Sequence, residues 1–100
     1  MAQFDVYKNT AKNKKQIPYL LDIQNDILNH LNTRVVIPLA LNKPYEKIIH
    51  PKFEIDNNTL IMMTTQLTGV PKDFLGEKVC SLEKKRTEII GSLDFLITGY

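Results

Sequence analysis

The sequence predicts a mainly β fold, a small twisted antiparallel sheet of short strands with one α-helix at its C-terminal end. Apolar residues recur with period two over most of the first two thirds of the chain, and with the period of a helix after residue 81. No repeat or low-complexity tract interrupts this pattern. The 100 residues, of which 43% are hydrophobic and 24% charged, are one domain's length of chain. We therefore expect a single domain over residues 1–100 with one core.

The first strands are predicted from short alternating or β-branched runs. Apolar and polar residues alternate over residues 4–7 and again over residues 19–24. Residues 34–39, RVVIPL, are apolar after the arginine and include three consecutive β-branched residues, which predicts a central strand. Pro38 lies in this run and has no N–H to donate, so we expect it at a strand end, a bulge or an edge.

A hairpin is predicted in the middle of the chain. Residues 53–55 and residues 59–66 have strand-forming composition, and the sequence DNN at residues 56–58 is typical of a turn. Residues 41–52 contain two prolines and show no clear period. We expect a loop or a short irregular helix there.

A C-terminal helix is predicted over residues 82–98. Four apolar residues fall at i, i+4, i+7 and i+8 and should face the core: Ile89, Leu93, Leu96 and Ile97. Ser81 is a suitable N-cap, and Glu83 lies in the first turn, where an acidic side chain is favourable. Gly99 can adopt the left-handed conformation that ends a helix.

The opposite face of this helix carries a stripe of small and polar residues, at i, i+4, i+7 and i+11: Thr87, Gly91, Asp94 and Thr98. Phe95 flanks the stripe and is expected to face outward. A mid-helix glycine costs about 1 kcal/mol relative to alanine, so Gly91 needs a reason. Either another protein packs closely against this face, or Gly91 lets the helix approach its own sheet while Phe95 covers a loop.

Charge and cysteine content exclude several classes of protein. The chain has 13 Lys plus Arg against 11 Asp plus Glu, a net charge of +2, which is too small for a strongly basic nucleic-acid binder. Cys80 is the single cysteine and cannot form an internal disulfide, as is usual in a reducing cytoplasm. The sequence contains neither a signal-peptide pattern nor the ~20 apolar residues of a membrane span. We expect a soluble, cytoplasmic protein.

Catalytic and metal-binding residues are sparse. His30 and His50 are the two histidines that could act as general bases near neutral pH, and neither lies in a known motif. We expect both to be solvated, and Cys80 to be a packing residue rather than a nucleophile. With one cysteine and two scattered histidines, we expect no metal site and no cofactor.

Five sequence blocks in a fixed order resemble the CcdB toxin family. They are QFDVY at residues 3–7, DIQNDI at 22–27, RVVIPLA at 34–40, MMTTQL at 62–67, and VP at 70–71 followed by GEKV at 76–79. The resemblance runs from residue 3 to residue 100 with differences in loop length. It implies a small barrel-like sheet of the CcdB/MazF type, assembled as a homodimer with the two terminal helices together.

The resemblance also implies a function, which is inhibition of DNA gyrase by binding its A subunit and trapping the cleaved DNA complex. This is the activity of the toxin in a type II toxin-antitoxin pair, neutralised by a CcdA-like antitoxin and contacting DNA only through the antitoxin complex. Carried over to this chain, the gyrase contacts are Ile27, Leu28, Thr87, Gly91, Asp94, Thr98, Gly99 and Tyr100. The stripe deduced from helical spacing coincides with this set.

Three positions depart from the best-known members of the family. Those members have asparagine in place of Asp94, tryptophan in place of Thr98 and isoleucine in place of Tyr100. Loss of the tryptophan removes a large interface side chain. Tyr100 and Phe95 are placed to restore part of that area.

The alternative is the MazF-like branch of the same fold, whose members cleave messenger RNA. Their strand after the central hairpin resembles Gln-Ile-Arg-x-Val, in which the arginine stabilises the phosphate in the transition state. Residues 66–70 of this chain read QLTGV, so Thr68 stands at the arginine position. We therefore expect an inhibitor rather than an enzyme.

A basic run at residues 8–15, KNTAKNKK, is expected to be a solvated loop. It has no interleaved aromatic residues, which argues against nucleic-acid binding. A better use would be docking of an acidic, disordered antitoxin tail. The sequence does not specify individual antitoxin contacts.

Overall fold

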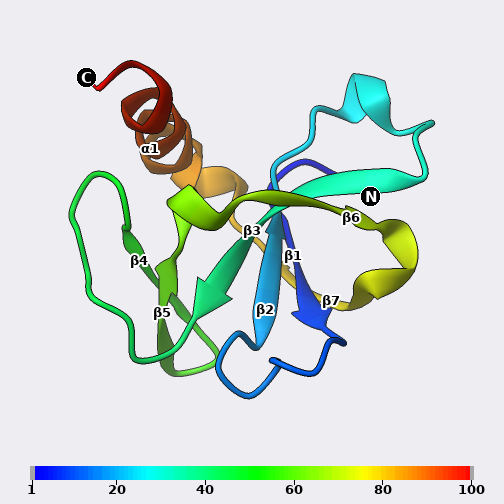
Figure 1. The fold of residues 1–100 in the computed structure, drawn as a ribbon, viewed down its shortest axis with the longest axis horizontal. Coiled ribbons are helices and arrows are strands. Elements are labelled where there is room, and N and C mark those ends of the chain that lie inside the picture. The colour runs from blue at the N-terminus through cyan, green and yellow to red at the C-terminus, as the bar shows by residue number, and fades with distance from the viewer. Residues whose placement is uncertain (1, 100) are drawn as a thin grey trace.

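One antiparallel sheet of seven strands dominates the computed structural model, which describes residues 2–99 (Figure 1). The elements are β1 (Asp5–Asn9), β2 (Tyr19–Asp22), β3 (Thr33–Ala40), β4 (Lys52–Ile55), β5 (Asn58–Met62), β6 (Thr68–Pro71), β7 (Leu75–Ser81) and the helix α1 (Arg86–Thr98). The strand order is β4-β5-β3-β2-β1-β7, and β6 also pairs with β3. The sheet curls into a half-barrel with the helix at one end, which confirms the predicted mainly β fold.

Strand β3 is the centre of the sheet, as residues 34–39 predicted. It pairs with β2 along one side, and on the other side with β6 over residues 33–36 and with β5 over residues 39–40. Pro38 lies inside β3, between these last two pairings, and its C=O accepts the N–H of Met63 at 2.9 Å. The N atom of a strand residue points to the same side of the strand as its C=O. The missing N–H of Pro38 therefore lies on the side where the partner of β3 changes from β6 to β5.

The β4–β5 hairpin confirms the predicted turn. Asp56 and Asn57 have φ values of 51° and 65°, as a two-residue turn of the type favoured in hairpins requires. The predicted strand over residues 59–66 is too long, because β5 ends at Met62 and residues Thr64–Gln66 form the 3-10 turn η2. The buried Thr64 hydroxyl lies 2.7 Å from the Ser92 hydroxyl of α1, so the chain leaves the sheet here to reach the helix.

Other strand predictions need correction. β2 ends at Asp22, not at residue 24, and neighbouring Leu20, Leu21 and Asp22 are all buried, so its alternation does not separate an inner from an outer face. The same holds for residues 4–7, which are all buried. The residue period did not predict strands β6 and β7, since their side chains are mostly exposed or half-buried without a clear period. Residues 41–51 form the expected loop.

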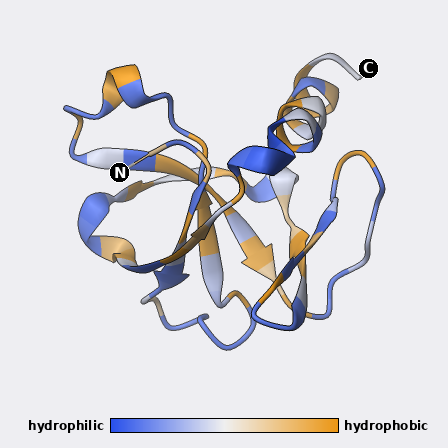
Figure 2. Cartoon of the chain, turned by 180° about the vertical axis from the view of Figure 1, so that it is seen from behind, coloured by the Kyte–Doolittle hydropathy of each residue, from blue (hydrophilic) through white to orange (hydrophobic). Residues whose placement is uncertain are grey.

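The core lies between the sheet and the start of α1. Figure 2 shows the hydrophobic residues concentrated along the central strands and the hydrophilic ones on the surrounding loops. The buried cluster consists of Phe4, Val6, Leu21, Ile37, Leu39, Phe53, Ile55, Leu60, Met62, Leu82 and Ile89. Phe4 has a φ of 72°, an unusual conformation for a bulky residue. Its N–H and C=O bond Asp22 and Leu82, which hold it there.

The C-terminal helix starts later than predicted. Residues Glu83–Lys85 form a 3-10 turn, η4, and α1 begins at Arg86 rather than at residue 82. The Ser81 hydroxyl still accepts the N–H of Glu83 at 3.2 Å, at the entrance to this turn. Gly99 has a φ of 77° and ends the helix as expected.

The residues that α1 buries differ in part from those that its apolar period predicted. Ile89 is buried, and Leu93 and Leu96 are half-buried, but Ile97 is 80% exposed and is not the core residue that was predicted. The last turns of the helix extend past the edge of the sheet (Figure 1). Ser92 provides a polar anchor instead, because its hydroxyl donates to the C=O of Ile49 at 2.8 Å. Within residues 2–99, no helix is long and apolar enough to cross a membrane.

Candidate protein-binding surface

The small and polar stripe of α1 lies at the surface, as predicted. Thr87 and Asp94 are exposed, and Gly91 is half-buried between them. Together with Arg86 and Ile90 they line a shallow hollow of 330 Å³. A second hollow of 340 Å³ adjoins it across Gly91, lined by Lys47, Ile48, Glu88, Gly91 and Ser92.

Gly91 lines both of these hollows. A Cβ atom built on Gly91 would meet no heavy atom within 4 Å outside its own helix backbone and chain neighbours. The helix therefore does not approach its own sheet at this residue, and that explanation of the glycine is wrong. Close approach of another molecule is the alternative that stays open.

The end of the helix departs in part from the prediction. Phe95 is half-buried rather than facing fully outward. Thr98 is exposed, and its hydroxyl donates to the C=O of Asp94 at 2.7 Å. Gly99 is exposed, while Tyr100 lies outside the described residues.

Ile27 and Leu28 lie on a protruding 3-10 turn, η1 (Asp26–Leu28). The Asn25 side chain starts this turn by accepting the N–H of Ile27 at 2.9 Å. Ile27 is 81% exposed and Leu28 is 42% exposed, and the nearby Leu31 is also exposed. Apolar side chains this accessible gain nothing in an isolated chain, so the turn has the composition of a docking site.

A single chain does not bring the two groups of predicted contact residues together. The η1 turn and α1 occupy separate corners of the molecule in Figure 1. The N-terminal segment connects them, because the N–H of Gln3 donates to Asp26 at 2.8 Å and its side-chain oxygen lies 3.5 Å from the Arg86 guanidinium. Arg86 also stacks over the Phe4 ring, at 5.5 Å from its centroid.

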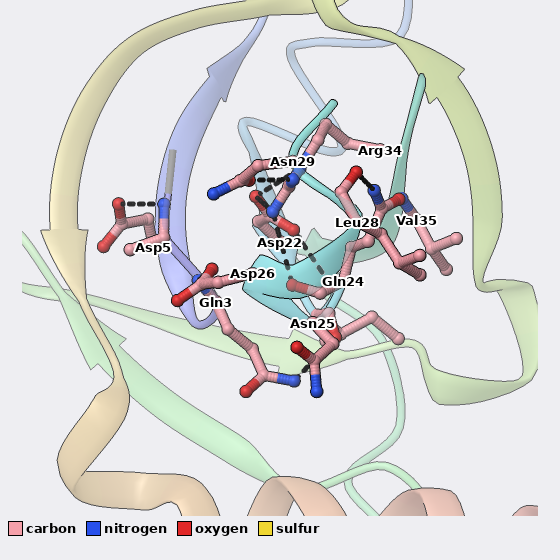
Figure 3. Close-up of polar contacts among 12 residues, drawn as sticks. Gln3, Asp5, Asp22, Gln24, Asn25, Asp26, Leu28, Asn29, Arg34 and Val35 are labelled. Atoms are coloured by element: carbon pink, nitrogen blue, oxygen red, sulfur yellow. Dashed lines mark hydrogen bonds and ion pairs between the residues drawn. The ribbon is translucent and has the colours of Figure 1, made fainter. Parts of the chain in front are cut away.

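A buried polar network lies under the η1 turn, and sequence reasoning missed it (Figure 3). Arg34 at the start of β3 is completely buried and pairs with the equally buried Asp22, at 2.7 Å from Nη2 to Oδ2. Burial raises the pKa of the Asp22 carboxyl, while hydrogen bonds from Arg34 and from the N–H of Gln24 act in the opposite direction. The sequence offered one signal, a charged Arg34 inside the run that predicts a central strand.

Residues considered for catalysis are scattered. His30 is exposed, as expected, whereas His50 is half-buried with Nε2 at 3.1 Å from the Thr65 hydroxyl. Cys80 is half-buried against the core, and burial raises the pKa of its thiol, which disfavours the reactive thiolate. Thr68 is exposed on β6. Among residues 2–99, no three His, Cys, Asp or Glu side chains converge as metal ligands would.

The basic run is a solvated loop only in part, because Lys8 and Asn9 belong to β1 and Asn9 is buried. Lys12, Lys14 and Lys15 are exposed in the loop between β1 and β2. A hollow of 210 Å³ lies where this loop meets the start of the 41–51 loop, and it is lined by Lys15, Gln16, Leu41, Asn42 and Lys43. This surface combines positive charge with one apolar residue.

The model of the CcdB protein family matches residues 3–99 of the chain. Solved structures similar to this chain include two mycobacterial proteins. An endoribonuclease from a mycobacterial species, in complex with its cognate antitoxin, has a TM-score of 0.73 at 16% identity, over 94% of this chain and 91% of that one. Another mycobacterial endoribonuclease has a TM-score of 0.68 at 14% identity, over 94% of this chain and 88% of that one. At such identities the likeness confirms the fold alone.

Proposed function

Because this chain belongs to the CcdB family, we propose that it is the toxin of a type II toxin-antitoxin pair that binds the gyrase A subunit and poisons DNA gyrase. It acts by binding and not by catalysis. Its place of action is the cytoplasm, where gyrase works on DNA. The gyrase-binding surface comprises Ile27 and Leu28 on the η1 turn, the α1 stripe, and the last residues of the chain.

The observation that carries this proposal is the open space at Gly91. A glycine that costs helix stability, and at which an added Cβ would meet nothing in its own fold, is what a helix face needs when another protein must approach its backbone. Thr87 and Asp94 flank it in the same hollow and supply hydrogen-bonding groups. Ile27 supplies apolar area, and full burial of such a side chain contributes roughly 1.5–3 kcal/mol.

A homodimer would complete this surface. Ile97 is 80% exposed near the end of α1, and a second copy packed against this helix end would cover it. A two-fold axis buries each such contact twice. The family resemblance, with its paired terminal helices, supports the same arrangement.

An acidic antitoxin segment would dock on the basic loop. Lys15 and Lys43 line the hollow at Leu41, and Lys12 and Lys14 are exposed in the same loop as Lys15, so charge attraction and one apolar contact are available together. A disordered segment that folds on contact uses this kind of surface. The solved mycobacterial relative, which has an antitoxin in its structure, supports such a partner.

The endoribonuclease alternative rests on the fold of the two solved relatives. Against it, Thr68 stands where the MazF-like motif has its arginine, and no histidine lies on β6. His50 contacts Thr65 on η2, outside that strand. We propose the chain as an inhibitor because its residues supply a binding face more clearly than a cleavage site.

A gyrase supercoiling assay run beside an RNA cleavage assay separates the two functions. The parent protein should block supercoiling and trap cleaved DNA while leaving a mixed-sequence RNA intact. Ile27→Ser should lose inhibition without losing stability, because the side chain is exposed. Phe74→Ser is the matched control, as it removes another exposed apolar side chain on a different turn, η3 (Lys72–Phe74), and should inhibit like the parent. RNA cleavage that disappears in Thr68→Ala would overturn the proposal.

A further inference from the structure

The segment that carries Ile27 and Leu28 has no hydrophobic anchor. All residues from 25 to 33 are exposed, and the η1 turn contributes no buried side chain. Apolar packing therefore does not fix its conformation. Polar contacts from the neighbouring strands must do so.

Two buried side chains, Gln24 and Arg34, supply contacts of this kind, in addition to the Gln3 N–H on Asp26 and the Lys72 ammonium on the C=O of Asn29. The Gln24 side chain donates from Nε2 to the C=O of Leu28 at 3.0 Å and accepts the N–H of Val35 at 2.9 Å, so it joins the turn to β3. Arg34 donates from Nη1 to the Asn29 side chain and from Nη2 to the C=O of Gln24 (Figure 3). The C-terminal end of the η1 turn and the chain just before the turn are thus attached to groups that lie inside the protein.

Asp22 orients this arginine. Its Oδ2 accepts from Nε of Arg34 at 2.9 Å and pairs with Nη2, which leaves Nη1 directed at Asn29. Its Oδ1 accepts the N–H of Gln24 at 3.0 Å. A buried ion pair is often no more stable than apolar residues of the same volume, so stability alone is a weak reason for this pair.

We propose that Asp22, Gln24 and Arg34 are positioning residues, which hold the η1 turn so that Ile27 and Leu28 meet the gyrase A subunit in one prepared conformation. The proposal rests on the proposed function for its partner. A turn held in its bound shape avoids the ordering entropy that a mobile turn would lose on binding. Loss of the network should therefore weaken binding although none of these side chains needs to touch gyrase.

Two variants test this proposal. The double variant Asp22→Leu with Arg34→Met replaces the ion pair by apolar side chains and leaves no unpaired charge. Gln24→Met severs the attachment to Leu28 and serves as the second variant if the double variant does not fold. Tyr19→Phe is the control, since it removes a hydrogen bond to Asp56 at the opposite end of β2.

Amide hydrogen exchange of the free protein and affinity for the gyrase A subunit are then measured together. We expect exchange at least tenfold faster at residues 27–31 and at least tenfold weaker gyrase binding. Exchange should be unchanged in β5 and in β3, except at Val35, whose N–H loses its acceptor in Gln24→Met. Tyr19→Phe should match the parent in both. Parental exchange at residues 27–31 in a folded variant would overturn the proposal, as would faster exchange across the whole sheet.

Failure of the proposed function gives a different result. A parent protein that does not bind the gyrase A subunit would overturn that function. The exchange rates of residues 27–31 would still decide whether Gln24 and Arg34 position the turn.

Discussion

Gly91 is a residue whose cost to folding stability can be set against a proposed role in binding. It lies in the middle of α1, where alanine would be more stable, and no neighbouring atom forbids a side chain. The reason we propose is the approach of a partner protein to this face of the helix. This separates the effect of a substitution on stability from its effect on binding.

Gly91→Ala should raise the free energy of unfolding by about 1 kcal/mol, because alanine loses less conformational entropy in a helix. The same methyl group stands between the two hollows and should weaken binding to the gyrase A subunit by tenfold or more. Urea unfolding and calorimetric titration measure the two effects. A variant that is stabilised and binds gyrase like the parent would show that the partner does not approach this residue.

Tyr7 gives a prediction for alkaline pH. Burial, followed by the neighbouring Asp5 carboxylate, raises the pKa of Tyr7 to about 12. The folded state thus holds the phenol proton more tightly than the unfolded state, whose pKa is near 10. Its contribution to stability is complete below pH 10 and is lost as the pH rises towards 12.

The loss should be on the order of 2 kcal/mol over that range. Urea unfolding at several pH values from 8 to 11.5 measures it, and Tyr7→Phe supplies the comparison because it cannot ionise. The parent should lose stability more steeply than Tyr7→Phe above pH 10. Equal slopes would contradict the assignment.

At the scale of elements, the sequence pattern predicted a strand or turn correctly where neighbouring residues alone determine it. The apolar run of β3 and the DNN turn were both predicted, since a central strand and a tight turn are specified by adjacent residues. β6 and β7 exist through pairing with distant strands and show no apolar period of their own. Ile97 matched the helical period but lies beyond the sheet that would have buried it.

The candidate surface was predictable to a similar extent. The stripe around Gly91 follows from helical spacing, and the exposed Ile27–Leu28 pair from the family resemblance. The network of Asp22, Gln24 and Arg34 was not predictable, because it depends on the register that sets Asp22 opposite Val36. Such register is decided by the whole sheet.

The helix end provides a truncation test. A variant that stops at Thr98 loses the exposed Gly99, whose N–H bonds the C=O of Phe95 at 2.9 Å, together with Tyr100. Its melting temperature should stay within a few degrees of the parent, since chain ends carry little stability. Gyrase affinity should fall roughly thirtyfold, the usual effect of losing an interface anchor of about 2 kcal/mol.

Antitoxin binding serves as the control for this truncation. The proposed antitoxin site is the basic loop between β1 and β2, which the truncation does not change. A truncated protein that arrests growth as well as the parent would place the gyrase contacts elsewhere.

At the scale of the whole molecule, we expect a dimer in solution. Multi-angle light scattering at micromolar concentration should give twice the chain mass of 11.5 kDa. Ile97→Lys should raise the dissociation constant of the dimer by a hundredfold or more, because the symmetric contact loses two buried side chains. A parent protein with the mass of one chain would refute the dimer.

The pairing of β1 with β7 ties the finished fold to the order of synthesis. β1 can pair with β2 soon after both are synthesised. Its other neighbour, β7 (Leu75–Ser81), is synthesised only after the four strands β3 to β6. At about 5–20 residues per second, a ribosome takes several seconds to cover that interval. Until then the sheet lacks its edge strand β7, and α1 has not yet been synthesised. During most of its own translation the chain therefore has no complete surface with which to harm the cell that makes it.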